Sequence, residues 1–190
     1  MTTRPENSLT EKELVELIRK KDTRAEGAFY DRYAGYLTAV CSRYITGRES
    51  ARDVLQDAFV KIFSQWNRFE YRGEGSLKAW TARIVANTAI KALRHEGKLV
   101  HPERFPETET EPEEDPPAAE IPPEVLQEMI RKLPPGYRTV FNLYVFEDYK
   151  HKEIARLLGI GESSSASQLS RAKSLLAKEI KEYQKKHAHD

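Results

Sequence analysis

The 190-residue chain has a single cysteine and no long hydrophobic run. Cys41 therefore has no partner for an internal disulfide, and no segment approaches the roughly 18 consecutive apolar residues that a membrane span needs. The first residues, MTTRPENSLTEKELVEL, also lack the apolar stretch of a secretory signal. We therefore expect a cytoplasmic protein that does not insert into a membrane.

The residue combinations of most enzyme active sites are missing too. The five histidines do not group with carboxylates or with Cys41 at the spacings of metal ligands, and no glycine-rich phosphate loop follows a strand. These absences predict a protein that is not an enzyme and that carries neither a metal ion nor a cofactor.

The chain also lacks the alternating pattern of β-strands, and its apolar residues recur instead at spacings of three and four. This periodicity predicts an all-α fold. A first helix begins with a capping box formed by Thr10 and Glu13. Further helices are expected near 24–46, 50–66, 76–95, 123–133, 135–147, 150–158 and 162–184.

Proline and negative charge are concentrated in one segment. Residues 102–123 hold seven of the ten prolines, and residues 102–124 carry nine Asp or Glu against one Arg, whereas the parts before and after carry net charges of +5 and +4. Such a segment buries too little apolar surface to offset its ordering entropy, so we expect a flexible acidic linker over 97–122 between small helical domains at 9–96 and 123–184. It is either a solvated tether or a shield that covers a basic domain until nucleic acid displaces it. Mildly basic domains suit a polyanionic partner.

The segment HKEIARLLGIGESSSASQLSRAKSLL has the pattern of a helix-turn-helix, with Gly159 ending the first helix and the second beginning near Glu162. Serine lowers helix propensity, but its short side chain lets a helix approach the major groove of DNA closely. A helical projection places the candidate contact residues on one arc, with two cations further along for phosphates: Ser163, Ser164, Ser167, Gln168, Arg171 and Lys173. The alternative is a solvated face in which Ser163 or Ser164 only caps the helix.

Two stretches of the first domain carry further candidates. RDVLQDAFVKIF predicts an amphipathic helix with a polar face, which is either a docking surface or an ordinary solvated face. NRFEYRGEGSLKAWTARIVANTAIKALR combines aromatics, arginines and a glycine-rich loop with a helix whose Arg83, Asn87 and Lys91 share one face. Unpaired bases are held by planar surfaces and cations of this kind. Trp80, at helical spacing from Leu77 and Ile84, is predicted to belong to the core.

Taken together, these motifs resemble those of the extracytoplasmic-function (ECF) sigma factors of bacterial RNA polymerase. Residues 29–94 are similar to the second conserved region of that family and residues 133–176 to the fourth, in the family's order and with a linker between them. The resemblance extends over about residues 24–180. It implies a factor that binds core RNA polymerase, recognises the −10 and −35 promoter elements and promotes strand opening.

The resemblance also implies roles for particular residues of this chain. The pocket for a flipped −10 base is expected to comprise Tyr71, Arg72, Gly73, Glu74, Ser76 and Asn87, with Arg83, Lys91 and Arg94 along the DNA backbone. Docking on the clamp helices of the polymerase is expected from Asp53, Gln56, Asp57, Val60 and Lys61. Family members often carry Lys or Arg at the position of Ala166, so one phosphate contact of the −35 complex is expected to be missing here.

Regulation and two other function classes stay open at this point. The resemblance suggests an anti-sigma factor that clamps the two domains together, although the acidic linker is an equal candidate for restraining them. The other classes are a stand-alone helix-turn-helix regulator, whose first domain senses a ligand or dimerises, and a helical interaction protein without a DNA role.

Overall fold

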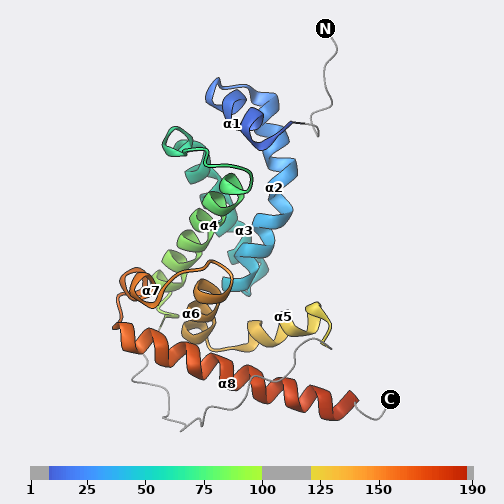
Figure 1. Ribbon diagram of the computed structural model, residues 1–190, viewed down its shortest axis with the longest axis vertical. Helices are drawn as coiled ribbons and strands as arrows, with labels where there is room; N and C mark the ends of the chain where they lie inside the picture. The colour runs from blue at the N-terminus through green and yellow to red at the C-terminus, as the bar shows by residue number, and fades with distance from the viewer. Residues whose placement is uncertain (1–8, 100–120, 188–190) are drawn as a thin grey trace. The chain divides into compact units, whose positions relative to one another are not determined.

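The computed structural model describes residues 9–99 and 121–187, and all regular structure within these ranges is helical (Figure 1). The all-α prediction is therefore confirmed. The chain divides into two compact units, residues 1–92 (unit 1) and 93–190 (unit 2). Most of the predicted linker, 97–122, lies outside the described residues, and the predicted domain limits 9–96 and 123–184 stay predictions. No described helix has the length and hydropathy of a membrane span.

The described part of unit 1, from residue 9 onward, contains four helices and a short 3₁₀ turn. These are α1 (Glu11–Arg19), α2 (Thr23–Tyr44), α3 (Arg48–Ser64), η2 (Trp66–Arg68) and α4 (Ser76–His95), whose last residues extend past the unit boundary. The predicted capping box at α1 is confirmed, because the Glu13 N–H donates to Thr10 Oγ1 at 3.2 Å and the Thr10 N–H donates to Glu13 Oε2 at 2.8 Å. The side chain of Asp22 caps α2 by accepting from the Arg24 and Ala25 N–H groups.

Aromatic side chains form much of the core of unit 1. The buried ring of Phe29 lies 5.2 Å from the ring of Trp66, edge to face, and Trp66 in turn contacts Trp80 at 5.9 Å. Trp80 also packs on Phe69 at 5.0 Å, so it is a packing residue as predicted, although its side chain stays half-buried. The indole N–H of Trp66 donates to the Val15 carbonyl at 3.4 Å, which ties α1 to this cluster.

Unit 2 contains α5 (Pro123–Lys132), α6 (Pro135–Val145), α7 (His151–Leu158) and α8 (Glu162–His187). Helix α8 packs against α5, α6 and α7, and the buried side chains of Ile130, Tyr137 and Leu176 belong to one apolar core. Gly159 ends α7 with φ 70° and ψ 36°, a left-handed conformation that favours glycine, as its predicted C-cap role requires. The helix-turn-helix prediction is thus confirmed.

The turn between α5 and α6 is held by a buried arginine. Arg138 donates from Nη1 to the Arg131 carbonyl at 2.5 Å and to the Leu133 carbonyl at 3.3 Å, which satisfies acceptors at the end of α5. Burial, with a smaller contribution from the charge of Arg131, lowers the pKa of the Arg138 guanidinium. Arg138 therefore stabilises the turn between α5 and α6 from its buried side.

Candidate nucleic-acid interface

The first turns of α8 present a short-chained polar surface. Ser163, Ala166, Ser167 and Ser170 are exposed there, while Ser164 is half-buried. Lys173 is exposed about a turn further on. We call these residues the serine face. Between Glu162, the exposed first residue of α8, and Lys173, no exposed side chain on this face is longer than a hydroxymethyl group, so the helix axis could come close to a DNA groove.

Gln168 does not belong to this face, which corrects the sequence prediction. Its side chain is only 5% exposed, on the side of α8 that also buries Ser165, Leu169 and Ala172. The predicted arc was rotated too far towards the packed side, because it was centred on polar residues and not opposite the apolar ones. Ala166 and Ser170 are exposed in place of Gln168, and an arc drawn opposite Leu169 and Ala172 would have included Ser170.

Contacts beneath the serine face fix the angle between α7 and α8. His151 Nδ1 lies 3.0 Å from the hydroxyl of the buried Ser165, and the His151 ring stacks on Tyr144 at 4.8 Å. Further along α8, the half-buried Arg171 donates from Nη1 to the Tyr137 hydroxyl at 3.5 Å. The guanidinium predicted to meet a phosphate is thus also braced against α6.

In unit 1, the loop Tyr71–Ser76 (the glycine loop) has a defined conformation. Gly73 and Gly75 have φ of 116° and 85°, values that residues with a Cβ rarely adopt. The Arg72 N–H donates to Ser76 Oγ at 3.2 Å, and the Ser76 hydroxyl donates to the Gly73 carbonyl at 2.6 Å. Desolvation, with a smaller contribution from the negative charge of Glu74, raises the pKa of Tyr71. The loop thus offers an exposed arginine, Arg72, and an aromatic ring beside it.

A line of exposed polar side chains continues from the loop along α4. Arg83, Asn87, Lys91 and Arg94 are all exposed, and their spacing of three or four residues places them on one side of the helix, as predicted. Asn87 follows Ser76 by about 16 Å of helix rise. The candidates therefore form a track long enough for several nucleotides.

Glu11, a residue that the sequence prediction missed, anchors the glycine loop from α1. Its carboxylate is 2% exposed. Oε1 accepts from the Leu77 N–H at 2.9 Å and lies 3.3 Å from the Ser76 hydroxyl, while Oε2 accepts from the Gly75 N–H at 3.1 Å and from the Tyr33 hydroxyl at 3.2 Å. Periodicity could not reveal it, because its loop partners lie more than 60 residues away in the chain.

The predicted docking residues lie on α3. Asp53, Gln56, Asp57 and Val60 are exposed, and Val60 is 64% exposed despite being apolar. Lys61 is half-buried, and its Nζ donates to Thr88 Oγ1 of α4 at 3.1 Å. Lys61 therefore links α3 to α4, and its predicted contact with polymerase stays a prediction.

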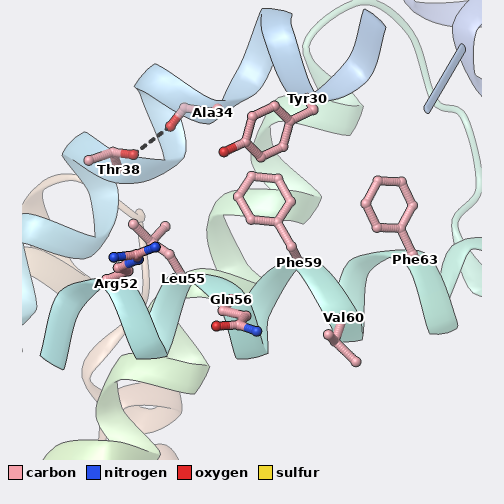
Figure 2. A pocket seen from close by; sticks show the side chains of 9 residues that line it. All are labelled: Tyr30, Ala34, Thr38, Arg52, Leu55, Gln56, Phe59, Val60 and Phe63. Atoms are coloured by element: carbon pink, nitrogen blue, oxygen red, sulfur yellow. Dashed lines mark hydrogen bonds between the residues drawn. The ribbon is translucent and has the colours of Figure 1, made fainter. Parts of the chain in front are cut away.

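An apolar groove of about 470 Å³ adjoins this α3 surface, on the side facing α2. Figure 2 shows Phe59 pointing from α3 towards Tyr30 of α2, with the ring centroids 5.0 Å apart, while Val60 points away from α2. Tyr30 is 53% exposed. Unit 1 thus presents acidic, amide and apolar groups within one surface.

Comparison with known proteins identifies both units. Residues 29–99 match the family model described as Sigma-70 region 2, and residues 124–176 match the one described as Sigma-70, region 4. The chain belongs to the sigma-70 family. This sigma factor is 25% identical to the ECF RNA polymerase sigma-E factor of Haemophilus influenzae, over 90% of this chain and 96% of the relative. It is also 25% identical to the RNA polymerase sigma-H factor of Pseudomonas aeruginosa, over 90% and 93%.

A solved structure shares the fold of this sigma factor. It is the sigma factor RpoE in complex with the anti-sigma factor NepR from Bartonella quintana, with a TM-score of 0.50, 20% identity, and coverage of 80% of this chain and 96% of that one. The expected resemblance to ECF sigma factors is confirmed. As a member of this group, the protein is a transcription initiation factor whose partners are core RNA polymerase and promoter DNA. Having both regions in one chain separates it from a stand-alone helix-turn-helix regulator.

Proposed function

We propose that this sigma factor places polymerase on promoters by contacting two DNA elements, and that it opens the duplex at the nearer one. The serine face of α8 enters the major groove of the −35 element, where hydroxyls of Ser163, Ser164 and Ser167 meet base edges. Arg171 and Lys173 contact phosphates, which fix the register without reading sequence. The buried Gln168 takes no part in this contact.

The −10 element binds unit 1 once its strands separate. An unpaired base is held at the glycine loop by Tyr71, Arg72, Gly73, Glu74 and Ser76, with Asn87 next along the track. The cations Arg83, Lys91 and Arg94 run beside the backbone of the same strand. Unstacking costs a few kcal/mol, and stacking on an aromatic ring returns about 1–3 kcal/mol for each base, so binding can drive opening without ATP.

Core polymerase docks on the exposed face of α3. Asp53, Gln56 and Asp57 supply acceptors and an amide, and the exposed Val60 supplies an apolar contact about one turn further along α3. Because opposite charges are matched across specific protein interfaces, this acidic surface suits a basic partner. Lys61, beside Val60, also donates to Thr88 of α4.

An anti-sigma factor is proposed as a further partner. The support is that the solved RpoE structure with the same fold was crystallised with NepR. Such a partner would compete with polymerase or DNA for the surfaces named above.

The observation that carries the proposal is the placement of a groove-sized polar helix face in unit 2 and a polar track beside a fixed loop in unit 1. The test is run-off transcription by core polymerase with this protein on a randomised promoter library, followed by permanganate footprinting of the selected promoters. We expect transcripts, together with unpaired thymines only when the protein is present. Transcripts without open bases, or no transcripts from competent components, would contradict the proposal.

A further inference from the structure

Glu11 combines burial with an unusual set of partners. Three of the four groups that reach its carboxylate come from the glycine loop and the first turn of α4: the Gly75 and Leu77 N–H groups and the Ser76 hydroxyl. A carboxylate removed from water is costly unless it is hydrogen-bonded, and here both oxygens have partners. The site also lies at the N-terminus of α4, where the helix dipole favours negative charge.

These contacts bear directly on the shape of the loop. Gly75 has φ of 85°, and its amide is held by Glu11 in that conformation. The Ser76 hydroxyl lies within hydrogen-bond distance of both the Glu11 carboxylate and the Gly73 carbonyl. Gly73 is therefore restrained as well. A six-residue loop with two glycines would otherwise sample many conformations, and each residue fixed costs about 1–2 kcal/mol of conformational entropy.

The anchor comes from outside the matched region. The region 2 match covers residues 29–99, whereas Glu11 lies on α1. Helix α1 is itself fixed to unit 1 at other points, since the Trp66 indole donates to Val15 and Arg19 donates to the Phe69 carbonyl. The carboxylate is therefore presented by a firmly attached element.

We infer that Glu11 is a positioning residue, which holds the glycine loop in the conformation that accepts an unpaired −10 base. The inference rests on the proposed function of that loop. Glu11 already orders the loop in the DNA-free protein, so that conformational entropy is not lost when the base binds. The affinity for the base is therefore higher, although Glu11 does not contact DNA. Discrimination between bases should depend on it as well, since a loosened loop can adapt to any base.

The test uses full-length protein in complex with core polymerase and a promoter selected by run-off transcription. Single-stranded −10 oligonucleotides, with each of the four bases at the position found to be unpaired, are titrated by fluorescence anisotropy. Glu11→Gln removes one acceptor oxygen and points an amide at N–H donors. We expect its Kd for the preferred oligonucleotide to rise about tenfold and its preference among the four bases to fall, while its Kd for core polymerase stays within about twofold.

Three variants complete the comparison. Glu16→Gln makes the same change at an exposed position of α1 and should behave as the native chain. Tyr33→Phe removes the one partner of Glu11 that lies outside the loop and the first turn of α4, and base preference should survive it. Glu11→Asp keeps both oxygens and should recover part of the preference that Glu11→Gln loses.

The outcomes separate this inference from the proposed function. Arg72→Ala, a change in the loop itself, should weaken −10 binding if the loop holds the base. If Arg72→Ala weakens binding but Glu11→Gln leaves affinity and preference unchanged, the positioning role is wrong and the loop assignment stands. If neither variant changes binding, the loop assignment is wrong. A Glu11→Gln protein that fails to fold or loses polymerase would make Glu11 a general determinant of the fold and overturn the inference.

Discussion

Cys41 is fully buried on α2, with its Sγ 3.6 Å from the Ala51 carbonyl oxygen. Burial raises the pKa of the Cys41 thiol to about 11. Since the thiolate is the reactive form, both access and ionisation protect this side chain. The single cysteine is thus a core residue and not a reactive one.

We predict that iodoacetamide modifies Cys41 at least about a hundredfold more slowly in the native chain than in urea. Raising the pKa of the thiol by about two lowers the fraction present as thiolate about a hundredfold. Mass spectrometry of timed samples measures both rates. Ser64→Cys in a Cys41→Ala background is the control, since residue 64 is exposed and its thiol should react quickly in the folded protein. Equal rates for native and denatured Cys41 would contradict the buried position.

Tyr33 gives unit 1 a pH dependence in alkali. Burial, with a smaller contribution from the negative charge of Glu11, raises the pKa of Tyr33 to about 12 from an ordinary 10.0. The folded chain therefore keeps its phenol proton at a pH where the unfolded chain loses it. The stability that Tyr33 contributes is complete below pH 10 and is lost as the pH rises towards 12.

We predict that Tyr33→Phe lowers the free energy of unfolding by about 1 kcal/mol at neutral pH, through the lost hydrogen bond to Glu11, and that this difference shrinks above about pH 10. Both tryptophans, Trp66 and Trp80, lie in unit 1, so their fluorescence during urea unfolding reports this unit. Cys41 is present in both proteins and its titration cancels. A difference that stays constant across this pH range would contradict the assigned shift.

The exposure of individual polar residues was predicted correctly where it depends only on their position around the helix axis. Asp53 and Asp57 are exposed as expected, because Val54 and Ala58 beside them fix the buried side of α3. Gln168 was misplaced, since the direction of its packing partners is a tertiary property. The hydrogen bond from Lys61 to Thr88 of α4 had no local signal either, because the two residues are 27 apart in the chain.

At the scale of elements, α8 has an exposed polar face in its first turns and a face packed into the core in its later turns. Its first turns carry the serine face, and its later turns bury Leu176, Ala177 and Ile180. Contacts from His151 to Ser165 and from Arg171 to Tyr137 join the two parts to α7 and α6. The serine face is therefore held by a rigid support, which suits the proposed contact with a DNA groove.

We predict that Ser167→Glu weakens binding to a −35 duplex about tenfold, or about 1.4 kcal/mol, because it brings a carboxylate against phosphates and base acceptors. Fluorescence anisotropy at one fixed salt concentration measures this. Gln127→Glu on α5 makes the same change of charge at an exposed position away from the serine face and should leave affinity unchanged. An unchanged affinity of Ser167→Glu for the −35 duplex would place the recognition surface elsewhere.

Helix positions followed closely from local signals, while the ends varied. The capping box at α1 and the glycine end of α7 were predicted because each is specified within a few residues. Helix α6 ends at Val145 and not near 147, and α8 continues to His187 and not to 184. The anchoring of the glycine loop by Glu11 had no local signal, since it depends on how α1 packs in the unit.

At the scale of the whole molecule, the sequence predicted two helical modules with different partners, and the two matched regions fall one in each part of the chain. Charge segregation and proline content predicted a linker between them, because these properties are averages over many residues, and its limits stay predictions. The residues that are exposed on each module could be identified only from the folded structure.

We predict that Asp57→Arg lowers the affinity for core polymerase about tenfold, since it reverses a charge within the exposed α3 surface, while binding of the −35 duplex by unit 2 stays unchanged. Co-purification with core polymerase and a fluorescence titration measure the two affinities. Glu16→Arg on α1 is a matched control, because it reverses the same charge at another exposed position of unit 1. Equal retention of Asp57→Arg and the native chain on polymerase would remove α3 from the docking surface.

The attachment of α1 has a practical consequence for dividing this protein into pieces. A shortened chain beginning at residue 29 would keep every position that matches the two sigma-70 regions, yet it would leave the Gly75 and Leu77 amides without their acceptor. Domain limits drawn from sequence similarity would thus cut through the structural unit. A fragment meant to keep the conformation of the glycine loop has to start ahead of Thr10, which caps α1.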